Sequence, residues 1–145
     1  MQGPPRPRRE FSLNKICKFA NGDSYKNDLF RHEAFANDKK VRVRWYLLRK
    51  EPVLESINKT YDEQFMLLTN EVAVPFAREM TYIVILYWLT HRERLLPEVW
   101  VRCQDKSSDN DRVYIGGLDS DGLGVSHYRC DRCSTPVGLA SSRKV

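Results

Sequence analysis

The chain lacks the sequence signatures of the common enzyme classes. Its seven glycines form no phosphate-binding loop or nucleophile elbow, and no metalloprotease helix is present. The three histidines, His32, His91 and His127, have no acid or nucleophile partner at a motif spacing. We therefore expect no enzymatic activity, although a catalytic site assembled from distant residues stays open.

Cysteines are few and long apolar runs are missing. Four cysteines in 145 residues are too sparse for a secreted disulfide scaffold, and no signal-peptide-like apolar run is found at the N-terminus. The longest uncharged stretch that is almost wholly apolar, residues 80–89, is shorter than the about 20 residues that span a bilayer. We expect a cytoplasmic protein with reduced thiols and no membrane partner.

Positive charge is concentrated in the first part of the chain. Residues 1–50 hold 13 Lys and Arg against 5 Asp and Glu, giving +8, whereas residues 51–145 hold 11 against 14, giving −3. Such asymmetry indicates a nucleic-acid or other polyanion partner. Attraction between the two halves within the fold is the alternative.

Composition predicts a basic tail followed by one domain. Residues 1–10 are rich in proline and arginine with little to bury, so we expect a disordered basic tail. Residues 11–145 have the length and mixed composition of a single domain. Within it, residues 12–22 and 24–35 permit two short helices.

The most apolar segment predicts a buried helix. Propensity favours a strand for residues 80–89, but residues 75–94 have helical length, with a tolerated Pro75 at the start and Pro97 beyond the end. A helix that is apolar on every side belongs in a core. Another helix should begin at Thr60, because Thr60 and Glu63 form a capping box.

After Pro97 the pattern changes to short alternating segments separated by turns. Residues 98–103, 112–115, 123–128 and 137–142 read as strands, with a hairpin turn at 119–122. The predicted fold is α+β, with three to four helices, one of them the buried apolar helix, packed on a four-stranded antiparallel meander. The residues expected on its inner face are Val99, Val101, Cys103, Val113, Ile115, Leu123, Val125 and Leu139.

The outer face of this sheet is the main candidate site. It would combine arginines and aromatic rings among small residues, as stacking platforms for single strands do. The alternating basic stretch 39–50 could add two arginines. The hypothesis is a nucleic-acid-binding protein. The alternative is a protein-interaction or structural module, which includes a module that self-associates. The candidate residues are Arg42, Arg44, Trp100, Arg102, Arg112, Tyr114 and Tyr128. Packing of that face within the protein is the competing interpretation.

A second motif, His127-x-x-Cys130-x-x-Cys133, has a spacing that suits zinc. Two cysteines three residues apart can both reach one tetrahedral ion, and His127 or Cys103 could complete the ligand set. Structural zinc sites usually show two such pairs, and only one is present. We therefore favour thiols without metal, and we expect no cofactor.

Several runs resemble a group of small hypothetical proteins from candidate-phylum bacteria. The runs are Trp45-Tyr-Leu-Leu-Arg-Lys-Glu-Pro-Val53, Tyr61-Asp-Glu-Gln64, Glu71-Val-Ala-Val-Pro-Phe-Ala-Arg-Glu79 and Gly138-Leu-Ala-Ser-Ser-Arg-Lys144. The likeness covers about residues 24–144. It implies a bacterial cytoplasmic protein and no particular activity. The Cys130 and Cys133 pair lies outside this pattern, which counts against zinc.

Overall fold

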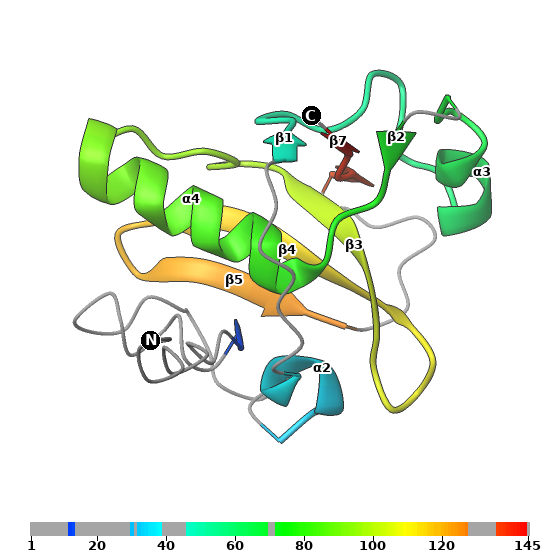
Figure 1. The fold of residues 1–145 in the computed structure, drawn as a ribbon, viewed down its shortest axis with the longest axis horizontal. Helices are drawn as coiled ribbons and strands as arrows, with labels where there is room; N and C mark the ends of the chain where they lie inside the picture. The colour runs from blue at the N-terminus through cyan, green and yellow to red at the C-terminus, as the bar shows by residue number, and fades with distance from the viewer. Residues whose placement is uncertain are drawn as a thin grey trace, which may run out of the picture.

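A long helix lying across a four-stranded sheet forms the centre of the molecule (Figure 1). The computed structural model describes residues 12–13, 30, 32–38, 46–69, 72–127 and 136–144. These parts contain three helices and two sheets, so the predicted α+β class is confirmed. The basic tail predicted for residues 1–10 lies outside the described residues.

The larger sheet differs from the predicted meander in its last strand. Strands β3 (Trp100–Lys106), β4 (Arg112–Asp119) and β5 (Gly122–Ser126) do form an antiparallel meander. Strand β6 (Val137–Leu139) instead lies parallel to β3, giving the order β5-β4-β3-β6. The antiparallel four-stranded prediction is therefore wrong. Alternation tells which face a side chain occupies, but either open edge of the meander can take a fourth strand.

The final strand belongs to a second, smaller sheet. Strands β1 (Tyr46–Leu48), β2 (Val72–Ala73) and β7 (Ser142–Lys144) pair antiparallel in the order β1-β7-β2. The chain crosses between the sheets at Ala140 and Ser141. Ala140 N donates to Arg102 O of the first sheet, and Ser141 O accepts from Arg49 N beside the second. The strand expected over 137–142 is thus divided.

Helix α4 (Ala77–His91) confirms that the apolar segment is helical, but only one side of it is buried. Met80 and Val84 point into the core, where α4 packs against β3 and β4. Leu89, near the C-terminal end of the helix, is 41 % exposed. The expectation of burial all round was therefore wrong. None of the helices in the described ranges has the length and hydropathy of a membrane span.

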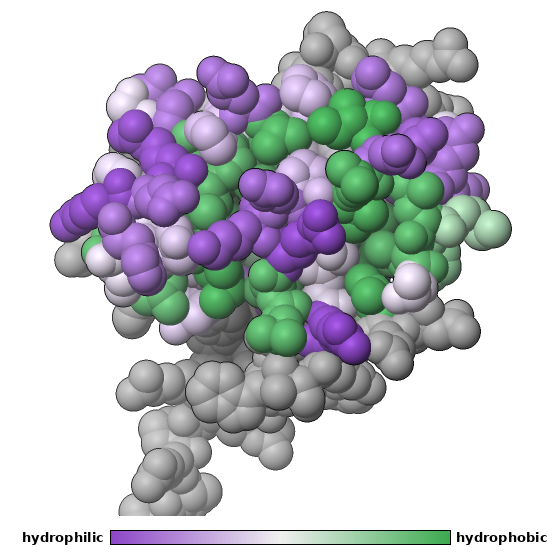
Figure 2. All heavy atoms as spheres, turned by 90° about the horizontal axis from the view of Figure 1, so that it is seen from above, coloured by the Kyte–Doolittle hydropathy of each residue, from purple (hydrophilic) through white to green (hydrophobic). Residues whose placement is uncertain are grey.

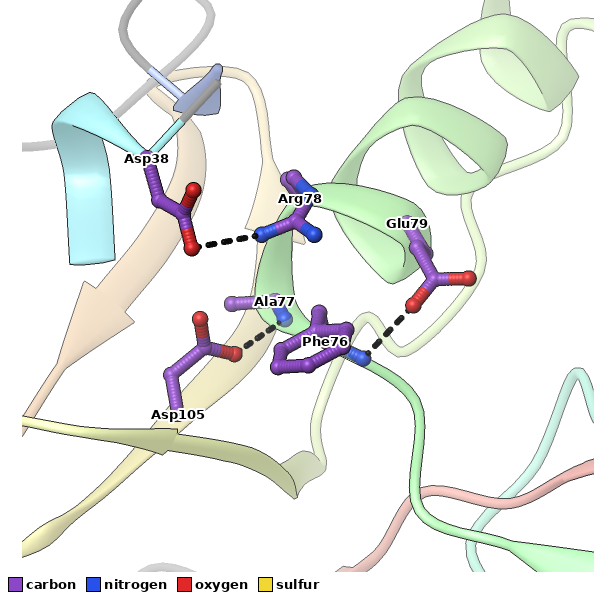
Figure 3. Close-up of polar contacts among 6 residues, drawn as sticks. All are labelled: Asp38, Phe76, Ala77, Arg78, Glu79 and Asp105. Atoms are coloured by element: carbon purple, nitrogen blue, oxygen red, sulfur yellow. Dashed lines mark hydrogen bonds and ion pairs between the residues drawn. The ribbon is translucent and has the colours of Figure 1, made fainter. Parts of the chain in front are cut away.

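The N-terminus of α4 is capped by a residue from the sheet (Figure 3). The N-cap residue, Phe76, has no side-chain acceptor, although the Glu79 carboxylate accepts from Phe76 N at 3.0 Å. Asp105 of β3 takes the missing role, because its Oδ2 accepts from Ala77 N at 2.6 Å. In return Gln104 N donates to Pro75 O. Helix start and sheet are therefore joined by two hydrogen bonds.

The two short helices are fixed by polar contacts. Helix α3 (Tyr61–Phe65) has the predicted capping box, with Glu63 N donating to Thr60 Oγ1 at 3.2 Å and Thr60 N to Glu63 Oε2 at 2.9 Å. Helix α2 (Ala34–Asn37) is anchored by its N-cap residue, Glu33. The Glu33 carboxylate accepts from Ser108 N and Ser108 Oγ on the β3–β4 loop.

The predicted inner face of the sheet is mostly confirmed. The core between α4 and the sheet contains Val101, Cys103, Val113, Ile115, Leu123 and Val125, with Val99 partly buried beside them. Leu139 is also buried, but it pairs with Arg102 and so lies on the opposite face. Its assignment to the inner face was wrong, because the parallel register of β6 could not be derived from alternation.

The buried cap makes a prediction about pH. Burial raises the pKa of Asp105 above its ordinary value of 3.8, against the lowering effect of the hydrogen bond from Ala77. The folded state therefore holds this proton more tightly than the unfolded state. The contribution of Asp105 to the free energy of unfolding should fall as pH rises from below 3.8 through the raised value.

Urea unfolding across this pH range, compared between the wild type and Asp105→Asn, isolates the effect. The asparagine is neutral throughout, so the wild-type stability minus the variant stability should decline with rising pH. Asp109→Asn, the same change at an exposed position on the β3–β4 loop, is the control for the substitution itself. A flat or rising difference for Asp105→Asn would contradict the burial argument.

Candidate nucleic-acid interface

The outer face of the sheet does bring two predicted aromatic residues together. The Trp100 and Tyr114 rings meet edge to face, with centroids 5.6 Å apart, and both side chains are half-buried. The Trp100 ring lies against Gly124, where an added Cβ would come within 1.9 Å of Cη2. The small residue therefore provides the space that the indole fills. Part of each ring is already covered.

Arg102 lies inside the protein. It is only 4 % exposed, and its Nη1 donates to Lys59 O at 2.8 Å and to Gln64 Oε1 at 3.0 Å. Gln64 Nε2 in turn donates to Ser56 O and Val137 O. The guanidinium group thus fastens α3 and the segment before it onto the sheet. This role leaves Arg102 turned away from any external phosphate.

Arg112 is also engaged within the fold, although less deeply. Its guanidinium carbon lies 4.0 Å from the centroid of the Tyr61 ring, and Nη1 donates to Gln104 O. Burial raises the pKa of Tyr61, while the nearby Arg112 charge opposes that rise. Arg112 of the sheet and Tyr61 of α3 therefore interact with each other.

Most of the remaining predicted site residues lie outside the part of the chain that the structure describes. Arg42, Arg44, Tyr128, Cys130 and Cys133 all lie outside the described residues. His127 is described, and its ring packs edge-on against Phe35 at 6.0 Å. Cys103 is fully buried in the core, where desolvation raises its pKa well above the ordinary value. Over the described ranges, no three His, Cys, Asp or Glu side chains are grouped to hold a metal.

The structure reveals a different cationic and aromatic group at the C-terminal end of α4. We call it the helix-end cluster; its members are Lys50, Tyr87, Trp88, His91, Arg92 and Arg94. The Tyr87 and His91 rings, one helical turn apart, stack at 4.2 Å with an interplanar angle of 9°. Lys50 Nζ lies 4.5 Å from the Tyr87 ring centroid and donates to Tyr87 Oη at 2.9 Å. This bond raises the pKa of Lys50 and keeps it charged.

Two arginines of this cluster share one indole ring. The guanidinium carbons of Arg94 and Arg92 lie 4.7 and 5.7 Å from the Trp88 centroid. Glu93 Oε2, the neighbouring carboxylate, lies instead beside Tyr87 Oη at 3.5 Å. Within the described part of the chain, no carboxylate pairs with either guanidinium group and no acceptor takes a hydrogen bond from either side chain. Both side chains are exposed.

No family model, curated protein or solved structure matches the chain. The sequence offered one signal for the helix-end cluster, because Tyr87 and His91 are four residues apart and share a helical face. The contact of Lys50 with Tyr87 had no such signal, since it joins residues 37 positions apart.

The different positions of Arg102 and Arg112 predict different effects on stability. Arg102→Met keeps the aliphatic stem but removes the donor shared by Lys59 O and Gln64 Oε1. We expect the free energy of unfolding to fall by about 2–3 kcal/mol, measured by urea denaturation. Arg112→Met should cost about 1 kcal/mol or less, because a partly exposed cation–π contact is weaker. Equal losses in the two variants would contradict the internal role of Arg102.

Proposed function

We propose that the protein binds single-stranded nucleic acid through the helix-end cluster. The observation that carries this proposal is the arrangement of Arg92 and Arg94 around Trp88. Each guanidinium group is positioned by the indole, while its N–H donors remain unpaired within the described residues. Guanidinium groups held in this way suit the oxygen atoms of a phosphate backbone.

The stacked rings supply a place for a base. Lys50 contacts the Tyr87 ring, and Tyr87 in turn stacks on His91. His91 is exposed, and in this proposal an unpaired base extends the stack on its ring. Stacking on an aromatic ring contributes about 1–3 kcal/mol per base and tolerates any sequence. This combination favours single strands over duplexes, whose bases are already stacked.

The position of the cluster also agrees with the charge distribution. Lys50 is the last residue of the basic stretch 39–50, and it lies two residues after the end of β1. The contact with Tyr87 therefore brings the end of that stretch to the C-terminal part of α4. The helix dipole favours cations at this end, which explains how the fold tolerates several of them together. The helix dipole alone does not explain why two arginines share one indole with no carboxylate partner among the described residues.

Titration with a labelled single-stranded oligonucleotide over a range of salt concentrations tests the proposal. The wild type should bind more weakly as salt rises, because phosphate contacts release counterions. In Arg92→Ser/Arg94→Ser, two contacts are lost, so the slope of log K against log salt should become shallower by about 1.4. The measurement is fluorescence anisotropy of the oligonucleotide.

Arg112→Ser is the matched control, because this arginine also lies over an aromatic ring but on the sheet face. Its affinity and salt slope should equal those of the wild type. A loss in Arg112→Ser without a loss in the double variant would transfer the site to the sheet face. Absence of binding by the wild type at low salt would remove the proposed function altogether.

A further inference from the structure

The surface around helix α3 carries an unusual concentration of exposed apolar side chains. We call it the α3 patch; its members are Leu54, Ile57, Phe65, Met66 and Leu67. Five of the seven large apolar side chains that are exposed in the described residues belong to it, so it is a cluster and not scattered exposure. Figure 2 shows apolar side chains gathered on the right of the view, edged by hydrophilic ones.

The burial pattern of α3 is the reverse of that in a helix that builds a core. Gln64, a polar residue, takes the inward position and is 0 % exposed. Its neighbours Phe65 and Met66 are 53 % and 82 % exposed. Leu54, in the turn before the helix, is 76 % exposed. Packing of this chain therefore does not explain why these positions are apolar, whereas an interface would.

The α3 patch is also held in a defined shape. Gln64 Nε2 donates to Ser56 O at 2.7 Å and to Val137 O at 3.1 Å, which ties the preceding turn and the helix to β6. Pro52 and Ser56 pack closely on Gly138, where an added Cβ would lie 2.5 Å from Pro52 Cβ. A preformed apolar surface costs less conformational entropy on binding than one that must order first.

The charges around the α3 patch indicate what kind of partner fits it. Residues 51–67 contain four acids, Glu51, Glu55, Asp62 and Glu63, against one base, Lys59. Their sum is −3, although the whole chain has a net charge of +5. All four acids are exposed. Arg112 of β4, which lies over the Tyr61 ring, reduces this local sum to −2. An apolar surface with exposed acids beside it is complementary to a segment with an apolar face and basic flanks.

We propose that the α3 patch is a docking surface for an amphipathic, basic helical segment of a partner protein. Apolar side chains of such a segment would cover Leu54, Phe65 and Met66, and its lysines or arginines would meet the exposed acids. Burial of the apolar face of an amphipathic helix is a recurring mode of peptide recognition. The α3 patch and the C-terminal end of α4 lie on opposite sides of Figure 1, so nucleic acid and partner can bind together.

Binding of a designed peptide to the full chain tests this proposal. The probe is a fluorescent leucine and lysine peptide of about 18 residues, five helical turns, with one apolar face. It should bind the wild type, and Leu54→Ser/Met66→Ser should weaken that binding at least about tenfold. Both residues are highly exposed, so the variant should keep its stability. Leu47→Ser, an exposed leucine of β1 outside the patch, is the control and should bind normally.

Two further peptides and one hydrodynamic measurement complete the test. A shuffled peptide without an apolar face, and a peptide with glutamate in place of lysine, should both bind at least about tenfold more weakly. Equal binding of either, no effect of the double variant, or no binding of the leucine and lysine peptide would overturn the proposal. So would a dimer in sedimentation that Leu54→Ser/Met66→Ser abolishes, because the occupant would then be a second copy. A monomer in both proteins supports a separate partner.

Discussion

The hydrogen bond from Ala77 N to the Asp105 carboxylate joins the two main elements of this protein. It connects the first residue of α4 to β3, at a point where the helix's own N-cap residue offers no acceptor. Burying a carboxylate is costly, and here the cost is offset by that bond and by the positive end of the helix dipole. Because a hydrogen bond fixes direction as well as distance, Asp105 sets the position of α4 on the sheet.

The rest of the arrangement follows from that position. With the helix start fixed, Met80 and Val84 face the sheet and Tyr87, Trp88 and His91 lie at the far end. Arg78 joins the same helix start to the end of α2, because its Nη1 lies 3.4 Å from Asp38 Oδ2. Its guanidinium carbon also lies 4.5 Å from the Phe76 ring centroid. The helix-end cluster therefore depends on a cap almost the whole length of α4 away.

Part of this fold could be predicted from local sequence. Length and end signals identified α4 against its strand propensity, the capping box identified the start of α3, and alternation separated Val101 and Ile115 from Trp100 and Tyr114. The pairing of β6 with β3 could not be predicted, because the alternation of apolar and polar residues does not show which edge of the sheet a further strand joins. In the sequence, Asp105 lies between the strands predicted over 98–103 and 112–115, and nothing nearby in sequence connects it with Ala77.

The candidate site was harder to predict for a related reason. Arg102 and Arg112 are both arginines on the same face of the sheet. Arg102 is nevertheless buried under α3, whereas Arg112 is partly exposed. The difference lies in Gln64, a residue 38 positions from Arg102. Conversely, Arg92 and Arg94 lie in the last turn of the helix predicted over residues 75–94, where cations are favoured in any helix. Only the folded structure shows that both guanidinium groups contact the Trp88 ring.

Amide hydrogen exchange of Ala77 in the native protein tests the central claim most directly. If the Asp105 carboxylate holds this N–H, its exchange should be as slow as that of the core amides of β3 and β4, and Asp105→Ala should accelerate it strongly. Exchange of the wild-type Ala77 amide at the rate of an unprotected helix end would contradict the account, because α4 would then not be fixed to the sheet at its start.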